Sequence, residues 1–304
     1  AFMGLIFLAA ATELPEAVTT ITAAVQNEAR LLLNNMFGGI TLQTAILAVA
    51  DAAVPAATLT FYPRKTTHAL EGTLLMLLLA MLLAVAALGE ANLVWNLGLG
   101  SVVLATAYIG CIVLLRNYEQ DSVWTPVEVP EELEVPLGGR LARDLDVVPL
   151  AALMRWSAAM TAVILVCGVA LVELAGVVAD QTGLGASFIG VTLLAASTSL
   201  PELSTTVAAV RIGSFTMAIS NIFGSNLIMV ALLLPADLFY RQGVLLERID
   251  PLATFALITG IVVTGIYVAG LLLRQKRRLF GMGIDSVVVL ALYLASLVVF
   301  YQLR

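Results

Sequence analysis

Long apolar stretches separated by short polar segments occupy most of the 304-residue chain. Each stretch is close to the roughly 20 residues that a helix needs to cross about 30 Å of hydrocarbon. The pattern predicts nine membrane spans, at residues 1–26, 33–52, 69–88, 93–116, 150–179, 184–210, 214–237, 250–274 and 282–303. We therefore expect an all-α integral membrane protein whose main partner is the lipid bilayer.

Composition supports this assignment to the membrane class. Hydrophobic residues make up 61% of the chain, charged residues 12%, and the mean hydropathy is +1.01. These values exclude an ordinary soluble domain. The sequence offers no basic groove with interleaved aromatic residues, so we expect no nucleic-acid partner. The two cysteines, Cys111 and Cys167, lie inside apolar stretches and are expected to act as small packing residues.

Two of the apolar stretches carry the same motif, and the chain repeats itself around it. TELPE at residues 12–16 corresponds to TSLPE at residues 198–202, and an offset of 186 gives eleven identities in the first twenty positions. The same offset pairs Asn35 with Asn221 and Asp51 with Asp237. Interrupted apolar segments at matching positions of two halves point to the binding site of a secondary transporter.

The repeat also predicts the domain organisation. The span at 150–179 precedes the second motif, and its counterpart before the first motif would fall ahead of Ala1. We expect a ten-helix, five-plus-five architecture with the first helix missing from this chain. The expected parts are a first repeat at 1–116, an acidic linker at 117–148 and a second repeat at 149–304. Five spans per half would make the repeat inverted.

Charge predicts the orientation of these spans. The linker has eight acidic residues against two arginines, whereas most lysines and arginines outside it fall on the same side as the linker. Because positive loops stay inside, we expect a protein of the plasma (inner) membrane with a cytoplasmic linker and an extracytoplasmic C-terminus. Asp51 and Asp237, at the far ends of equivalent spans, are expected to act at opposite membrane interfaces.

The carboxylates of the two motifs are the candidates for function. A charged carboxylate at the bilayer centre costs about 2.5–3.5 kcal/mol on insertion scales, so Glu16 and Glu202 need a reason to be there. One reason is a neutral, hydrogen-bonded Glu that stabilises a helix broken at Pro15 or Pro201. The alternative is a metal site, because two carboxylates with neutral oxygen donors form a cage for a hard cation such as Ca²⁺.

Seven neutral side chains on the same or adjoining spans are the expected additional ligands. They are Thr12, Thr198, Ser199, Asn35, Asn221, Ser225 and Gln43. Hydrogen bonding between helices is the alternative role for each of them.

At these residues the chain resembles the sodium/calcium exchangers and the wider cation/calcium antiporter superfamily. STSLPE at 197–202 and NIFGSN at 221–226 are similar to that family's second repeat, and ATELPE at 11–16 and NMFGG at 35–39 to a diverged first repeat. The resemblance implies ten helices, alternating access, and Glu16 and Glu202 as acids shared by competing cations.

The chain departs from that family at three positions. Met229 stands where such exchangers carry an acid, Gln43 stands where Asn is common, and Glu13 replaces a serine. Our hypothesis is that Glu13 restores the missing negative charge or holds a proton that titrates during transport. The alternative is a residue at the mouth of the site that merely attracts cations.

These features predict a secondary active antiporter that exchanges Ca²⁺ for Na⁺ or H⁺. The alternatives are a proton-coupled Na⁺/H⁺ exchanger of the same fold and, from another class, a cation channel. We expect no enzyme activity: His68 is the single histidine and no zinc-protease motif exists. The inverted topology argues against an aspartyl dyad formed by Asp51 and Asp237. No cofactor is expected beyond the transported cations, which are also the expected partners.

Overall fold

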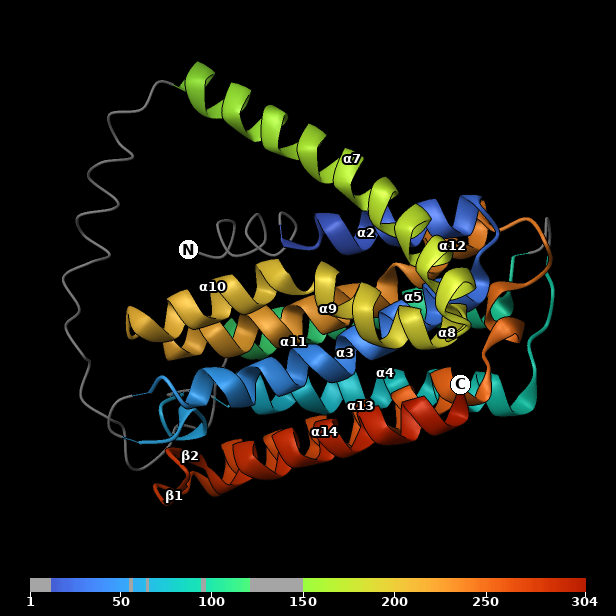
Figure 1. Cartoon of the computed structure of the whole chain (residues 1–304). Coiled ribbons are helices and arrows are strands. Elements are labelled where there is room, and N and C mark those ends of the chain that lie inside the picture. Colours follow the sequence, from blue (N-terminus) through green and yellow to red (C-terminus); the bar gives the residue numbers. More distant parts are fainter. Residues whose placement is uncertain (1–11, 55–56, 64–65, 94–96, 121–149) are drawn as a thin grey trace.

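The computed structural model describes residues 12–54, 57–63, 66–93, 97–120 and 150–304, and its elements form an elongated helical bundle (Figure 1). The helices of the first half are α2 (Leu14–Val25), α3 (Ala29–Asp51), η1 (Leu59–Phe61), α4 (Thr67–Leu88) and α5 (Leu99–Gln120). The second half contains α7 (Leu150–Thr182), α8 (Ala186–Ile189), η2 (Gly190–Leu194), α9 (Ala195–Thr198), α10 (Leu200–Arg211), α11 (Phe215–Ala231), α12 (Leu233–Phe239), η3 (Leu245–Arg248), α13 (Pro251–Leu273), β1 (Arg278–Leu279), β2 (Met282–Gly283) and α14 (Ile284–Leu303).

The predicted membrane spans are largely present. Within the described residues, seven helices are long and apolar enough to cross a bilayer, and the broken segment from Ala186 to Arg211 makes an eighth. The expected span at 1–26 is described only from Thr12 onward, where it forms the shorter apolar helix α2. Large apolar side chains such as Trp156 and Val166 on α7 are exposed, as expected for a surface that faces lipid. The linker prediction at 117–148 falls mainly outside the described residues.

One element departs from the all-α expectation. Strands β1 and β2 pair antiparallel as a small hairpin between α13 and α14. Phe280 and Gly281, at its turn, both have positive φ, of 53° and 82°. This conformation matches the right-handed twist of a two-residue hairpin. Among the described residues these two strands form the one sheet.

Helix α3 is the centre of the bundle. It contacts α2, α10, α11, α13 and α14, together with the segment from α8 to α9. Nearly all of its side chains are buried, including those of Asn34, Asn35, Gln43 and Thr44. A helix that is buried all round and still carries amides and hydroxyls must place these groups against partners in other helices. This requirement brings the polar residues of both halves together.

Both motif helices are interrupted where the sequence predicts. Ser199 separates α9 from α10, and the axes on either side are bent by 45°. Pro201 follows, and it cannot donate a hydrogen bond to the carbonyl of Ser197. In the first half, Glu13 is the residue before α2, and Pro15 occupies the first turn. The two breaks fall at equivalent positions of the sequence repeat.

The broken segment packs unusually close to α3. A Cβ atom on Gly38 would lie 2.6 Å from the carbonyl oxygen of Val191, and one on Gly190 would lie 2.7 Å from the carbonyl oxygen of Leu31. Gly190 begins η2, a wide turn of π-helix that recurs at functional sites in other proteins. Two glycines therefore allow backbone-to-backbone contact beside the motif.

Asp51 and Asp237 each bind two backbone N–H groups, and their predicted place at opposite membrane interfaces stays a prediction. Asp51 accepts hydrogen bonds from the backbone N–H groups of Leu59 and Gly283, each at 2.5 Å. Asp237 accepts them from Leu245 at 2.9 Å and Gly98 at 2.8 Å. Both side chains are buried, at 0% and 1% exposure, and each accepts hydrogen bonds from two backbone donors outside its own helix, which offsets the cost of burying the carboxyl group. Offset 186 relates Leu59 to Leu245, so the repeat preserves the contact as well as the residue.

Replacing Gly38 by Ala is expected to destabilise the protein, because the new Cβ would meet the backbone of Val191 and overpacking of this kind costs about 1–3 kcal/mol. The measurement is thermal unfolding of purified protein in detergent. Gly110→Ala is the matched control: Gly110 lies on the exposed side of α5, with no described atom within 4 Å of the new Cβ. Equal unfolding temperatures for the two variants would contradict the close packing.

Replacing Asp51 or Asp237 by Ala is expected to lower stability by similar amounts. Each change leaves two buried N–H groups without an acceptor, at about 1–3 kcal/mol for each group. The same unfolding measurement applies, with the exposed Glu247→Ala as the control for loss of an acid. A variant as stable as that control would mean that the Asp does not hold its two loops.

Candidate ion-binding site

All ten predicted ion-binding side chains are buried. Their exposed fractions run from 0% for Glu16, Glu202, Ser225 and Gln43 to 8% for Asn221. They come from α2, α3, α10 and α11 and from the residues at the two helix breaks. Helices α2, α10 and α11 each pack against α3, so the residues of both motifs are gathered around one central helix.

Glu16 and Glu202 occupy equivalent positions in the first turns of α2 and α10. The N-terminal end of a helix carries partial positive charge, which favours a negatively charged group in its first turn. A hydroxyl of the other motif lies near each carboxylate: Thr198 near Glu16, and Thr12 near Glu202. The two motifs therefore lie face to face at the breaks.

A chain of side-chain contacts joins five of the predicted residues. The Ser225 hydroxyl contacts Glu13 Oε1 and lies 2.8 Å from Gln43 Oε1. The amide nitrogen of Gln43 points toward Glu16 Oε1 at 3.5 Å and toward Ser199 Oγ at 3.4 Å. This network links α2, α3 and α11 with the break at Ser199.

Several oxygens of the site have no hydrogen-bond partner. Among the described residues these include one carboxylate oxygen each of Glu13 and Glu16, both oxygens of Glu202 and the amide oxygen of Asn35. Burial of such groups is costly unless a positive species satisfies them. Oxygen ligands are what Ca²⁺ and other hard cations require. In the part of the chain that the structure describes, no three His, Cys, Asp or Glu side chains converge as a ready metal cluster, so bound cations would depend on neutral donors as well.

Asn221 is engaged away from this network. Its amide donates to the hydroxyl of Thr205 at 3.1 Å and of Thr206 at 3.3 Å on α10. Thr205 in turn donates to the carbonyl of Pro201 at 2.9 Å, and Thr19 does the same to Pro15. The helix-to-helix role considered for Asn221 is therefore the one that the structure displays, and its value as a ligand remains a prediction.

Two polar contacts near the motifs were not predicted from the sequence. Asn226 donates to Thr44 at 3.4 Å, beside the Ser225–Gln43 contact. His68, the first-turn neighbour of Glu71 on α4, lies 2.9 Å from its carboxylate and 3.2 Å from Ser220 on α11. The contact of Asn226 with Thr44 could have been anticipated, because Thr44 directly follows Gln43 in the sequence. The second depends on how α4 meets α11, which the sequence does not reveal.

The sequence of this chain is similar to those of known membrane proteins. The family model described as "Sodium/calcium exchanger protein" matches residues 1–116 and 153–302. The inner membrane protein YrbG of Escherichia coli is 25% identical over 251 residues, covering 83% of this chain and 71% of that protein. The sodium/calcium exchanger MaX1 of Methanosarcina acetivorans is 43% identical over 67 residues, covering 22% of this chain and 19% of that protein.

Two solved structures have a similar fold. Native YfkE superposes with a TM-score of 0.58 at 16% identity, covering 98% of this chain and 88% of YfkE. A structure of the sodium-calcium exchanger NCX_Mj superposes with a TM-score of 0.59 at 19% identity, covering 97% and 85% of the two chains.

Proposed function

Because the chain belongs to the sodium/calcium exchanger protein family, we propose that it is a secondary active antiporter that exchanges Ca²⁺ for Na⁺ or H⁺ by alternating access. MaX1 and NCX_Mj are each named as a sodium/calcium exchanger. The proposal places this chain among transporters, with cations as cargo and no catalytic step.

The observation that carries the proposal is the burial of Glu16 and Glu202 in the first turns of two broken helices. Both carboxylates are costly to leave unneutralised inside a bilayer. Ca²⁺ neutralises them in one form of the protein, and Na⁺ ions or protons neutralise them in the other. The site changes its access from one side of the membrane to the other at low cost only when its carboxylates are neutralised. Ca²⁺ and the competing ions occupy the same carboxylates, so they bind one at a time. This mutual exclusion produces exchange.

The same proposal includes the architecture and its placement. It takes the ten-helix, five-plus-five inverted repeat as the fold, with the 117–148 linker on the cytoplasmic side and the C-terminus outside. The described spans, the equivalent breaks at Glu13 and Ser199, and the equivalent anchors Asp51 and Asp237 support it. The similarity to YrbG, named an inner membrane protein, supports the inner membrane as the location.

A second candidate function is proton-coupled exchange of monovalent cations. Met229 is the observation that favours it, because this buried thioether places an apolar group on α11 one turn beyond Ser225. A site with fewer oxygen ligands is less suited to Ca²⁺, which takes six to eight.

We expect Ca²⁺ uptake into proteoliposomes that contain the full-length protein, driven by an outward gradient of Na⁺ or of protons. The measurement is accumulation of radioactive Ca²⁺ with a Na⁺ gradient, a proton gradient, or neither. The Glu202→Gln variant is expected to fall to the level of empty liposomes, because it removes one of the two neutralised carboxylates. Glu247→Gln, at an exposed position, is the matched control and should transport as the wild type does.

Uptake that responds to one gradient identifies the coupling ion. Absence of Ca²⁺ uptake under both gradients, from protein that unfolds cooperatively in detergent, would contradict Ca²⁺ exchange. Proton movement driven by a Na⁺ gradient in the same vesicles, followed with an internal pH dye, would then establish the second candidate.

A further inference from the structure

The two repeats place chemically different residues at equivalent positions of the site. Offset 186 relates Glu13 to Ser199 and Gln43 to Met229. It also relates Ser225 to Gly39. One side of the site therefore consists of Glu13, Gln43 and Ser225, and the equivalent side consists of Ser199, Met229 and Gly39. We call these the polar side and the apolar side.

The contacts on the two sides correspond. On the polar side the Ser225 hydroxyl lies 2.8 Å from Gln43 Oε1. On the apolar side Met229 packs on Gly39 so closely that a Cβ there would lie 2.8 Å from the methyl carbon of Met229. The repeat thus keeps the same pair of positions in contact, and the chemistry of the pair has changed from two oxygens to a methyl group against a glycine.

The polar side has more acceptors than donors. Ser225 has one hydroxyl hydrogen, yet its oxygen contacts both Glu13 and Gln43. The amide hydrogens of Gln43 face Glu16 and Ser199, so its oxygen is the atom that faces Ser225. The second carboxylate oxygens of Glu13 and Glu16 are buried and unpartnered. A bound cation satisfies such an excess of oxygens.

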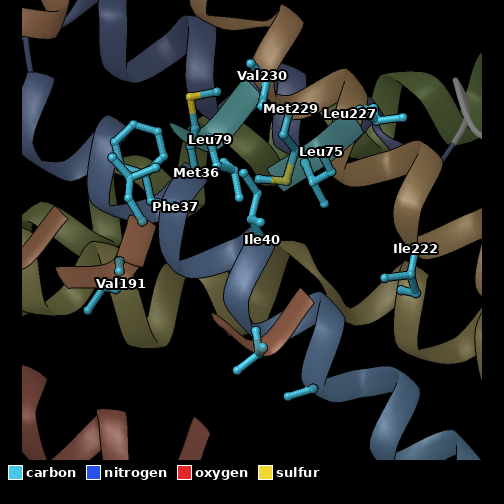
Figure 2. Packing of buried hydrophobic residues seen from close by; sticks show 14 of the residues in the cluster. Met36, Phe37, Ile40, Leu75, Leu79, Val191, Ile222, Leu227, Met229 and Val230 are labelled. Carbon is cyan, nitrogen blue, oxygen red and sulfur yellow. The ribbon is translucent and has the colours of Figure 1, made fainter. Parts of the chain in front are cut away.

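The apolar side is closed to a cation. Met229 is 1% exposed and belongs to the hydrophobic cluster with Ile40, Leu75 and Leu227, as Figure 2 shows. Its thioether is a weak ligand for hard cations, which prefer oxygen. With a glycine opposite Met229, this side keeps only the hydroxyl of Ser199.

We propose that the transported cation sits off the axis that relates the two repeats, held by Glu13, Glu16, Ser225 and Gln43, while Met229 against Gly39 closes the equivalent position. The inference rests on the proposed function, since it specifies where that site holds its cargo. The cation expected at this position is a hard one, bound by oxygen atoms. Glu13 supplies a second carboxylate beside that of Glu16, and the charged or titratable groups that face Glu13 are Glu16 on α2, Glu202 on α10 and Tyr108 on α5.

The test measures equilibrium binding of radioactive Ca²⁺ and Na⁺ to the purified full-length protein in detergent. Glu13→Gln and Ser225→Ala each remove an oxygen ligand or its charge from the polar side. Both are expected to raise the Kd of the bound cation by roughly tenfold or more, equivalent to about 1.4 kcal/mol. Glu247→Gln, at an exposed position outside the site, is the control for loss of an acid, expected to bind within about twofold of the wild type, a difference of under 0.5 kcal/mol. Glu13→Asp retains the charge and should recover most of the affinity lost in Glu13→Gln.

The binding results distinguish failure of this inference from failure of the proposed function. Wild-type affinity in both Glu13→Gln and Ser225→Ala, with binding lost in Glu202→Gln, would place the cation on the axis and overturn the inference while leaving the proposed function intact. Absence of binding of either cation to the wild-type protein would overturn both. Thermal unfolding of every variant in detergent separates loss of binding from loss of folding.

Discussion

The burial of three carboxyl groups inside an apolar helical bundle is the constraint on which the rest of this structure depends. Such groups are tolerated in a membrane only where protein or a bound ion compensates them. Glu16 and Glu202 lie in the first turns of broken helices, where the helix ends carry partial positive charge. Glu13 contacts a hydroxyl on α11. The helix breaks are therefore part of the electrostatic solution, and continuous helices at these two places would lack it.

The packing around α3 makes this solution geometrically possible. Polar side chains from separate helices meet only if the helices approach closely, and Gly38 and Gly190 allow that approach beside the second motif. Apolar residues on the outer helices face lipid, whereas the amides and hydroxyls are directed inward. The protein thus concentrates its polar groups on internal helix surfaces and leaves its outer surface apolar.

The sequence was sufficient for most of the spans and for the breaks, because each follows from a local signal, and it singled out ten side chains that the structure buries. Apolar runs define spans, Pro15 and Pro201 define breaks, and the repeat identifies Glu16 and Glu202. The contact of Ser225 with Glu13 and Gln43 could not be predicted in the same way, since it depends on how three helices pack. The same holds for Asp51 and Asp237, whose backbone partners lie outside their own helices in short segments with no recognisable motif. The hairpin of β1 and β2 was also missed, because two-residue strands leave no periodic pattern.

Asp51 and Asp237 also join the two repeats to each other. Each binds one N–H group in its own half, on Leu59 or Leu245, and one in the other half, on Gly283 or Gly98. Each carboxylate therefore ties its own half of the chain to the other half. Separation of the two halves would leave one buried backbone donor in each of them without its acceptor, so the two aspartates clamp the repeats together from both directions.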